Sequence, residues 1–485
     1  MFKGFDIFSL NTTVITRVNK QFPTKHKHII TTWWMMSGEW QRIVYATIYA
    51  VREGLVIKPV QEAIRKAVRR YKLESTRYDK KISGIVYNVF RNQGLLEKII
   101  YDLSGININD LPRELKAPLY VLAYVSQLDN KSSKTIKRTF KRYITRYIFT
   151  YTKEKELLSR INETIKIIYE KKWKPRTFED KVLQRYKISL QLYNALEKAL
   201  RELQENIEEF LDKTMKVEHR VFRVNKLKAS VDAIINYLSS SGYIVERGKY
   251  SPQAIRVKGS LGKEIIKLVE TGILIPQDES SMVAVEILSP RPSSKIADLC
   301  AAPGGKTTYL AEITNLKSEI HSFEIYKDRA KRLRLLLERT GTNSVVRIYV
   351  EDARKAPLIL GNETMDYVLV DPPCSSTGAL ARNPDVRWRY RQEDVEKLST
   401  LQYEILVAGW KILKKKGRLL YTVCSVLPLE GEYVIKKFIE EHEDAKLIDL
   451  GKPFKKSPIL PQTMRAWPHI HRTIGFYYAL LEKDP

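Results

Sequence analysis

Short apolar runs alternate with longer amphipathic stretches from about residue 295 to the end of the chain. The runs at 295–300, 319–324, 345–350, 367–371 and 418–424 have the length of buried strands, and the stretches between them have helical spacing. This alternation predicts a doubly wound α/β fold of the Rossmann-like kind, with a mainly parallel sheet. Ligands of such sheets bind beyond the carboxyl ends of the strands, so the residues at those ends are candidates for a site.

The rest of the chain divides into four parts of different character. Residues 1–37 form an N-terminal extension, and residues 38–155 have apolar positions at three- and four-residue spacing, which predicts an all-helical domain. Residues 156–215 read as a charged helical connector, and residues 216–285 mix short strands with helices, which predicts a small α+β module. The doubly wound domain then occupies residues 286–485.

Positive charge is concentrated ahead of the doubly wound domain. The chain has 84 lysines and arginines against 56 acids, a formal net charge of +28. Residues 1–285 hold 52 basic and 30 acidic residues, a net of +22, which leaves +6 for the remainder. The densest run, 131–146, contains seven cations and no acid. Four aromatic residues lie within or beside such clusters: Tyr71, Phe140, Tyr143 and Tyr147. Such runs are either solvated helix faces or a site for nucleic acid, in which rings stack on bases.

Three cysteines, Cys300, Cys374 and Cys424, all fall in the last 200 residues. Their odd number and wide spacing fit neither a disulfide framework nor a zinc site, so we expect a cytoplasmic protein without a metal. No run reaches the ~18 apolar residues that a membrane helix needs, and the first twenty residues lack a secretion signal. We therefore expect nucleic acid rather than a membrane as the polyanionic partner, and a monomer.

The segment 298–306, DLCAAPGGK, is the most informative motif. Its small residues and two glycines follow a strand and let the backbone approach a ligand closely. The ending Gly-Lys-Thr imitates a phosphate-binding P-loop, but Cys300 replaces the first glycine of that motif and Pro303 occupies the phosphate nest, which argues against an ATPase. The alternative is a nucleoside-binding loop for S-adenosylmethionine. Glu324 would then accept hydrogen bonds from ribose hydroxyls, and Asp352 would meet the adenine amino group.

Two thiols and an acid close the last two predicted strands. Asp371 ends one strand and is followed by two prolines and Cys374, whereas Cys424 ends the other. Taken singly, the Asp-Pro-Pro segment would be interpreted as a rigid turn after a strand, and Cys424 as a small buried hydrophobic residue. Together they favour a reactive site that methylates carbon 5 of a pyrimidine: a thiolate adds to carbon 6, a carboxyl group assists at the ring nitrogen, and a second thiol helps the release. These residues alone do not decide which thiol attacks.

Four motifs occur in a fixed order and together resemble the Sun/Fmu-type RNA cytosine-5 methyltransferases over about residues 216–485. They are DLCAAPGGK at 298–306, DPPCSSTG at 371–378, Cys424-Ser425 with Glu430 and Glu432 following, and RAWPHIHRTIGF at 465–476. The resemblance implies that Cys424 is the nucleophile, that Asp371 assists and that Cys374 helps product release. It also implies that S-adenosylmethionine is the cofactor and lies among Cys300, Ala301, Ala302, Pro303, Gly304, Gly305, Lys306, Glu324, Asp352 and Asp371.

The resemblance extends, in outline, to the other domains. Residues 216–285 are similar to the RRM-like module of this family, and residues 38–155 to the NusB-like RNA-binding domain of its ribosomal-RNA members. Ribosomal RNA is therefore favoured over transfer RNA as the substrate. The chain departs from the family pattern at Val423, where threonine is usual, and at Ile474, where an acid is common.

Two other functions remain open from the sequence. An exocyclic-amine nucleic-acid methyltransferase also uses Asp-Pro-Pro turns, but it favours an aromatic residue at the position of Cys374 and has no use for Cys424. A catalytically idle RNA-binding or ribosome-assembly factor would bind RNA tightly without cofactor-dependent methyl transfer.

Overall fold

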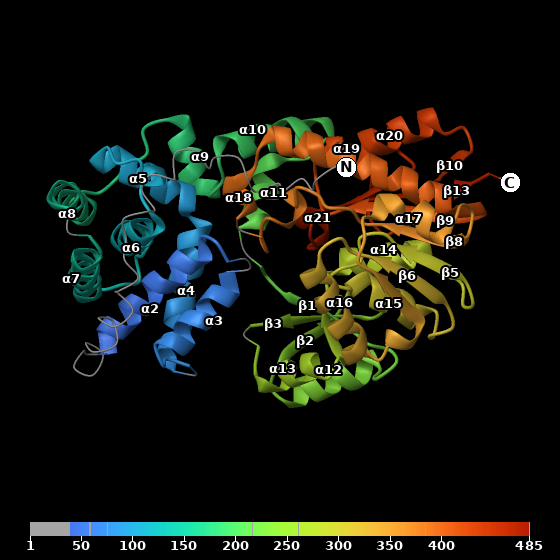
Figure 1. Cartoon of the computed structure of the whole chain (residues 1–485), viewed down its shortest axis with the longest axis horizontal. Helices are drawn as coiled ribbons and strands as arrows, with labels where there is room; N and C mark the ends of the chain where they lie inside the picture. The colour runs from blue at the N-terminus through green and yellow to red at the C-terminus, as the bar shows by residue number, and fades with distance from the viewer. Residues whose placement is uncertain are drawn as a thin grey trace. The chain divides into compact units, whose positions relative to one another are not determined.

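The computed structural model describes residues 39–57, 60–74, 76–152, 154–215, 217–259, 261–383 and 385–484. The N-terminal extension predicted for residues 1–37 lies outside this part of the chain. Contacts divide the chain into two compact units, Met1–Lys174 and Pro175–Pro485, whose elements are labelled in Figure 1. Among the described helices, none combines the length and the apolarity that crossing a membrane requires.

The first unit is helical throughout its described part. Amphipathic helices bury their apolar faces in a shared core that includes Ile48, Phe90, Val121, Ile144 and Ile165. Its helices are α2 (Glu39–Gly54), α3 (Val60–Arg70), α4 (Arg77–Arg91), α5 (Gln93–Ser104), α6 (Arg113–Ala123, continued by a wider turn at Tyr124–Leu128), α7 (Lys134–Tyr151) and α8 (Lys155–Glu170), with a 3₁₀ turn at Ile108–Asp110. Helix α8 packs in this core, so the predicted connector 156–215 is divided between the two units.

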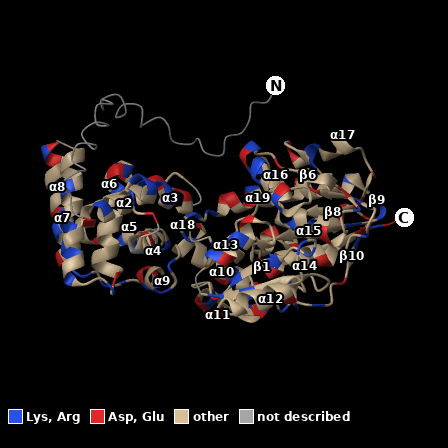
Figure 2. Cartoon of the chain, turned by 90° about the horizontal axis from the view of Figure 1, so that it is seen from below, with Lys and Arg blue, Asp and Glu red and all other residues tan. Residues whose placement is uncertain are grey.

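Helix α7 contains most of the dense basic run and has two distinct faces. Lys134, Arg138, Arg142 and Arg146 recur every fourth residue and are exposed, so they share one side of the helix, and Figure 2 shows basic residues along it. Phe140, on the opposite side, is fully buried in the helical core. The interpretation in which Phe140 and Tyr71 stack on bases is therefore wrong, because both rings are buried in the core. Tyr143 and Tyr147 are partly buried against the same core.

The second unit begins with three helices, α9 (Phe178–Tyr186), α10 (Leu190–Glu202) and α11 (Ile207–Thr214). A buried arginine, Arg387 in α18 (Val386–Arg389), fixes them to the doubly wound domain. Its guanidinium donates to the carbonyl of Tyr186 at 2.9 Å and to the carbonyl of Thr214 at 2.6 Å. These are the last residues of α9 and α11, so one cation satisfies orphan carbonyls at two helix ends.

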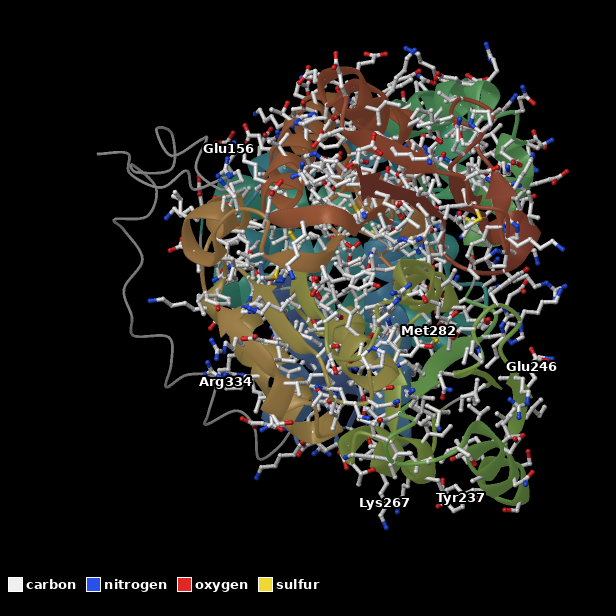
Figure 3. The ribbon with its side chains drawn as sticks, turned by 90° about the vertical axis from the view of Figure 1, so that its right-hand side faces the viewer. Glu156, Tyr237, Glu246, Lys267, Met282 and Arg334 are labelled. Atoms are coloured by element: carbon white, nitrogen blue, oxygen red, sulfur yellow. The ribbon has the colours of Figure 1, made fainter. Side chains whose placement is uncertain are left out.

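The small α+β module follows, and its strands pair antiparallel in the order β2-β3-β1-β4. Its elements are β1 (Arg220–Val224), α12 (Val231–Ser240), β2 (Ile244–Arg247), β3 (Ala254–Lys258), α13 (Lys263–Glu270) and β4 (Leu274–Pro276). Figure 3 shows Tyr237 and Lys267 on the outer side of its two helices, whereas Met282, in the next helix, lies in the interior. The predicted strands and first helix are present, and α13 and β4 complete a βαββαβ unit.

A nine-stranded sheet forms the doubly wound domain, in the order β11-β12-β13-β9-β8-β5-β6-β7, with β10 paired to β13. Its strands are β5 (Lys295–Asp298), β6 (Glu319–Phe323), β7 (Val346–Tyr349), β8 (Met365–Val370), β9 (Leu413–Val423), β10 (Ala445–Ile448), β11 (Lys455–Lys456), β12 (Met464–Ala466) and β13 (Phe476–Lys483). The five strands β5 to β9 are parallel, as predicted. Strands β10 to β13 are antiparallel and were not predicted.

Helices cover both faces of this sheet. Successive strand residues point to opposite faces: Ile296 and Leu369 contact the core under α14 and α15, whereas Ala297 and Val368 contact the core under α19 and α20. The helices are α14 (Glu279–Leu288), α15 (Gly305–Ile313), α16 (Lys327–Thr340), α17 (Ala356–Leu360), α19 (Gln392–Ile412), α20 (Glu432–Glu441) and α21 (Pro468–His471), with 3₁₀ turns at Asn343–Val345, Ala353–Lys355, Thr377–Ala379 and Pro428–Glu430.

A second buried arginine joins the α+β module to the doubly wound domain. Arg223, in β1, is fully buried and forms an ion pair with Glu312 in α15 at 2.7 Å. The same guanidinium donates to the Thr308 hydroxyl at 2.7 Å and to the Gly305 carbonyl at 2.6 Å. The module therefore fixes the first turn of the helix that follows the Gly-rich loop.

Replacing Arg223 by methionine is expected to destabilise the second unit by about 3–5 kcal/mol, because Glu312 would remain buried without its partner. The double variant Arg223→Met/Glu312→Leu should recover part of this loss, since it removes the unpaired charge. Urea unfolding followed by circular dichroism measures both. A single variant that unfolds at the wild-type midpoint would contradict a structural role for the pair.

Candidate active site

The carboxyl ends of the parallel strands meet at one edge of the sheet, and the predicted site residues follow them. Strand β5 ends at Asp298, Glu324 follows β6, Asp371 follows β8 and Cys424 follows β9. The register pairs Asp298 with Leu369, two residues before Asp371. The fold thus gathers carboxylates and thiols that are far apart in sequence at the edge where such sheets bind ligands.

Cys374 and Cys424 come together although 50 residues separate them. Their sulfur atoms lie 3.0 Å apart, and the Cys424 sulfur is 3.6 Å from the hydroxyl oxygen of Ser376. Both thiols are half-buried, and neither forms a disulfide. Two thiols in contact at this edge of the sheet indicate a reactive site much more specifically than either cysteine alone.

The surroundings of the two sulfurs make them chemically different. The pKa of Cys424 is lowered, first because the Cys374 thiol donates a hydrogen bond to it; the Ser376 hydroxyl and the Lys306 ammonium also lower it, whereas burial and Asp371 oppose them. The pKa of Cys374 is raised well above its ordinary value, first by the same hydrogen bond and then by burial. Cys424 is therefore the sulfur that ionises first, as a nucleophile requires.

An ammonium–carboxylate pair lies beside the thiols. The Lys306 nitrogen is 2.5 Å from a carboxylate oxygen of Asp371, and it lies 5.2 Å from the centre of the Phe476 ring. Burial by itself lowers the pKa of Lys306, but attraction to Asp371 more than offsets this, so the pKa is raised. Lys306 consequently stays charged and places a cation next to the thiolate and next to any base that binds there.

Glu430 holds the loop that carries Cys374. This glutamate is fully buried and accepts hydrogen bonds from the Ser375 amide at 2.8 Å, the Ser375 hydroxyl at 2.5 Å and the Gln402 amide nitrogen at 3.0 Å. The same Gln402 nitrogen donates to the Pro373 carbonyl at 2.9 Å. The loop is therefore fixed on both sides of Cys374, which keeps its thiol within reach of Cys424.

The far end of the same loop is tied to the end of β9. The Gly378 amide donates to the Cys424 carbonyl at 3.0 Å, and the Gly475 amide donates to the Gly378 carbonyl at 2.8 Å. A Cβ atom on Gly378 would lie 2.0 Å from the Gly475 carbonyl oxygen, so a residue with a side chain cannot occupy that position unless the backbone moves. Thr377 adds a contact between its hydroxyl and that of Ser425 at 3.0 Å.

A buried ion pair supports Ser425, the residue after Cys424. Arg465 and Glu432 are both fully buried, and the Arg465 Nε lies 2.6 Å from a Glu432 oxygen. A second nitrogen of Arg465 donates to the Ser425 carbonyl at 3.0 Å. The motif stretches that carry the resemblance contain Glu430, Glu432 and Arg465, but their positioning roles were not predicted, because a contact between distant segments leaves no local pattern.

The Gly-rich loop and the acid after β6 form a cradle that fits a nucleoside cofactor. Gly304 has φ of 109°, and a Cβ there would lie 2.7 Å from the Leu333 side chain, so only glycine fits. Arg329 donates to the Ala302 carbonyl at 2.6 Å and lies 3.4 Å from the buried Glu324 carboxylate. The loop is thus held beside an acid that can accept hydrogen bonds from hydroxyl groups.

Two predicted cofactor residues have surroundings that the sequence did not indicate. Both carboxylate oxygens of Asp352 accept hydrogen bonds from the Arg354 guanidinium, so an adenine amino group would share that carboxylate with it. The thiol of Cys300 has a pKa well above its ordinary value because of burial, and three nearby carboxylates raise it further. Cys300 is therefore a neutral thiol. No cluster of three potential metal ligands occurs among the described residues.

The buried carboxylate of Asp298 lowers the stability of the folded domain at neutral pH. It is 1% exposed, and burial raises its pKa to about 6, although the Thr307 hydroxyl donates to it at 2.7 Å. A carboxylate whose folded-state pKa exceeds its unfolded value of about 3.9 destabilises the fold increasingly as pH rises through that interval.

Asp298→Asn is therefore expected to raise the free energy of unfolding by about 1–3 kcal/mol at pH 7.5. This gain should fall to about 0.5 kcal/mol near pH 4, where the folded state is protonated and about half of the unfolded chains are. Urea unfolding at the two pH values measures it. Equal gains in the free energy of unfolding at both pH values, or a loss at pH 7.5, would show that the ionised Asp298 carboxylate does not destabilise the fold.

The strand order β7-β6-β5-β8-β9, with a Gly-rich loop after β5 and acids beyond the following strands, defines a Rossmann-like methyltransferase domain. Comparison with known proteins shows which family of methyltransferases this domain resembles. Residues 285–482 match the family described as 16S rRNA methyltransferase RsmB/F. The doubly wound domain therefore belongs to this Sun/Fmu-type family, which confirms the resemblance seen in the motifs, and the prediction of S-adenosylmethionine as the cofactor is also confirmed.

Curated relatives and solved structures agree with this assignment. The chain is 38% identical over 267 residues to ribosomal RNA small subunit methyltransferase B of Photorhabdus laumondii, a match to 54% of this chain and 59% of that protein. It is 32% identical over 270 residues to the probable enzyme of that name in Bacillus subtilis, with 54% and 60% covered. The match thus spans less than two thirds of these relatives.

Solved structures extend the similarity beyond the catalytic domain. The crystal structure of PH0851 has a TM-score of 0.82 and 35% identity, covering 91% of this chain and 99% of that one. A methyltransferase homolog protein from Pyrococcus horikoshii has a TM-score of 0.54 and 28% identity, covering 63% of this chain and 98% of that one.

Proposed function

We propose that this protein is an RNA (cytosine-5-)-methyltransferase that transfers a methyl group from S-adenosylmethionine through a covalent cysteine adduct. The observation that supports it most is the pair of thiols 3.0 Å apart beside the Lys306–Asp371 ion pair. A methyltransferase for exocyclic amines requires no thiol, and an idle binding factor requires neither thiol nor cofactor. A thiolate beside a cation is what addition to carbon 6 of a cytosine needs.

Bound S-adenosylmethionine would supply an electrophilic methyl group next to the thiols. The residues that would hold it lie at the ends of the first four parallel strands. They are Cys300, Ala301, Ala302, Pro303, Gly304, Gly305, Lys306, Glu324, Asp352 and Asp371.

The Cys424 thiolate would begin the reaction by adding to carbon 6 of an unstacked cytosine. The sulfur–carbon bond forms, and the electron pair of the 5,6 double bond makes carbon 5 nucleophilic while negative charge develops toward the ring nitrogen. Asp371 would bind the ring-nitrogen edge of the base, and the Lys306 ammonium would stabilise the developing charge.

Release reverses the addition after carbon 5 has gained its methyl group. The proton on carbon 5 passes to water, its electron pair reforms the 5,6 double bond, and the Cys424 thiolate leaves. Cys374 would assist by donating its thiol hydrogen bond to the departing sulfur, because its own pKa keeps it protonated. The two cysteines thus take separate roles: Cys424 attacks, and Cys374 helps release.

The substrate assignment belongs to the same proposal. Ribosomal RNA is favoured over transfer RNA, because the relatives of the catalytic domain are ribosomal RNA methyltransferases and the helical domain 38–155 would be the NusB-like part that holds folded RNA. The exposed cations of α7 would bind phosphates there, and the βαββαβ unit would be the RRM-like module. A monomer acting in the cytoplasm completes the proposal.

Methyl transfer tests the reaction directly. The protein is incubated with tritiated S-adenosylmethionine and unmodified 16S ribosomal RNA, and the labelled nucleoside is identified by mass spectrometry. We expect 5-methylcytidine from the wild type and none from Cys424→Ala. Label in N4-methylcytidine would favour the exocyclic-amine reaction, and RNA binding without label would favour the idle factor.

Cys374→Ala should behave differently from Cys424→Ala. Because release is impaired while attack remains, this variant is expected to accumulate a denaturation-resistant protein–RNA adduct, visible as a slower band in a denaturing gel. The double variant Cys374→Ala/Cys424→Ala is the control and should give no such band. An adduct that persists in the double variant would rule out Cys424 as its attachment point.

The pH dependence should report the ionisation of Cys424. Methyl transfer should rise with pH as the thiol loses its proton, with a midpoint below the ordinary thiol value of about 8.5, because the pKa of Cys424 is lowered. Lys306→Met removes a lowering charge and should move this midpoint to higher pH, whereas Lys306→Arg should largely retain it. An unchanged midpoint in Lys306→Met would contradict the role of the ammonium.

A further inference from the structure

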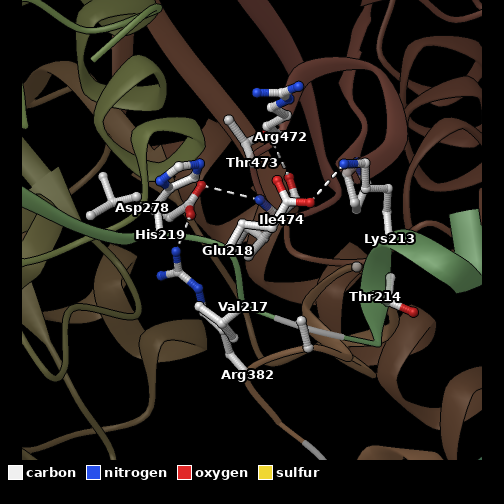
Figure 4. A pocket seen from close by; sticks show the side chains of 14 residues that line it. Lys213, Thr214, Val217, Glu218, His219, Asp278, Arg382, Arg472, Thr473 and Ile474 are labelled. Atoms are coloured by element: carbon white, nitrogen blue, oxygen red, sulfur yellow. Dashed lines mark hydrogen bonds and ion pairs between the residues drawn. The ribbon is translucent and has the colours of Figure 1, made fainter. Parts of the chain in front are cut away.

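A pocket with no role in the chemistry above lies in the second unit beside the catalytic loop. Lys213 at the end of α11, the segment around Glu218, Arg382 after the catalytic loop and the segment 468–474 form its walls, as Figure 4 shows. It lies outside the cofactor cradle and includes neither thiol. Part of its wall, 472–474, belongs to the motif 465–476, whose function the reaction leaves unexplained.

The pocket adjoins the nucleophile through the backbone. Gly378 lines it, and the Gly378 amide donates to the Cys424 carbonyl at 3.0 Å. Ile474 lines it from the other side and is followed by Gly475, whose amide donates to the Gly378 carbonyl at 2.8 Å. A strand of nucleic acid that places one base at Cys424 would therefore run past this pocket with a neighbouring nucleotide.

Two of the three cations in the pocket already have partners. Arg382 donates to the buried Asp278 carboxylate at 2.6 Å, and Lys213 donates to Glu218 at 2.7 Å. The guanidinium of Arg472, which is exposed, forms no hydrogen bond or ion pair with the described residues. With three cations and two carboxylates, the pocket keeps one positive charge available to an anion from solution.

Apolar side chains line the space between these charges. Val217 is 46% exposed, and the half-buried Ala381 and Ile474 contribute further apolar surface. An apolar wall beside a free guanidinium suits a nucleotide, because the flat base covers the apolar atoms and the phosphate takes the charge. A free phosphate would leave the apolar wall without a partner, and an apolar ligand would leave the charge without one.

We propose that this pocket binds a nucleotide of the RNA substrate that flanks the target cytosine, with Arg472 on its phosphate and its base against Val217, Ala381 and Ile474. The inference rests on the proposed RNA methyl transfer and adds to it a second contact point on the substrate strand. Arg472 is in this account a substrate-binding residue that takes no part in the bond changes.

The test compares Arg472→Gln with Arg418→Gln in the full-length protein. Arg418 also belongs to the doubly wound domain, but it lies in β9 six residues before Cys424, in a surface ion pair with Glu482. Glutamine is unbranched like arginine, so it adds no strain at Arg472, whose φ is 57°. Kinetics are measured with 16S ribosomal RNA and tritiated S-adenosylmethionine over a range of salt concentrations.

We expect Arg472→Gln to raise KM for RNA about tenfold, the loss of one charged hydrogen bond, while kcat and cofactor affinity stay near wild type. The slope of log KM against log salt should become shallower by ~0.7. Arg472→Lys should restore the slope and part of the KM, and Arg418→Gln should change neither.

Equal KM values and salt slopes for Arg472→Gln and Arg418→Gln would overturn the proposal while leaving the methyltransferase reaction intact. A loss of kcat without a change in KM would also overturn it, because the residue would then affect the chemistry. An absence of labelled cytosine with the wild-type protein would instead reject the proposed function on which the inference rests.

Discussion

The whole site depends on one buried carboxylate, that of Glu430. Its oxygens accept hydrogen bonds from Ser375 and from Gln402, and Gln402 in turn fixes the Pro373 carbonyl. Cys374 lies between these two anchored residues, so its thiol has little freedom to move away from Cys424. A fully buried acid is expensive to desolvate, and here the cost is offset by donors that the catalytic loop itself provides.

Buried arginines connect the segments around this site in a similar way. Arg465 supports the Ser425 carbonyl, Arg223 holds the first turn of α15, and Arg387 caps two helices of the preceding segment. Each guanidinium presents several donors in a plane and can satisfy carbonyls from different segments at once. The catalytic geometry is therefore maintained by polar contacts between distant parts of the chain, in addition to the apolar cores on both faces of the sheet.

The parallel part of the fold could be predicted because strand length, helical spacing and the Gly-rich turn are local properties. Strands β10 to β13 were not predicted, because short antiparallel strands at a sheet edge depend on their partner more than on their own pattern. The sequence predicted that Cys374 and Cys424 follow two strands that end at the same edge of the sheet. It did not predict that their sulfur atoms are in contact, which depends on how the loop after β8 folds. Their unequal acidity could not be predicted either, since it arises first from the hydrogen bond between the two thiols and then from Ser376 and Lys306 beside Cys424. The burial of Phe140 could have been inferred, because Phe140, Ile144 and Ile148 recur every fourth residue and so share the face of α7 opposite its exposed cations.

The central claim is that Cys424, and not Cys374, forms the bond to the base. RNA containing 5-fluorocytidine tests it most directly, because fluorine at carbon 5 cannot leave as a proton does and the adduct is retained. Digestion of the trapped complex and mass spectrometry of its peptides then identify the modified residue. We expect a nucleotide attached to Cys424 in the wild-type protein; a nucleotide attached to Cys374 would show that Cys374 is the residue that attacks the base.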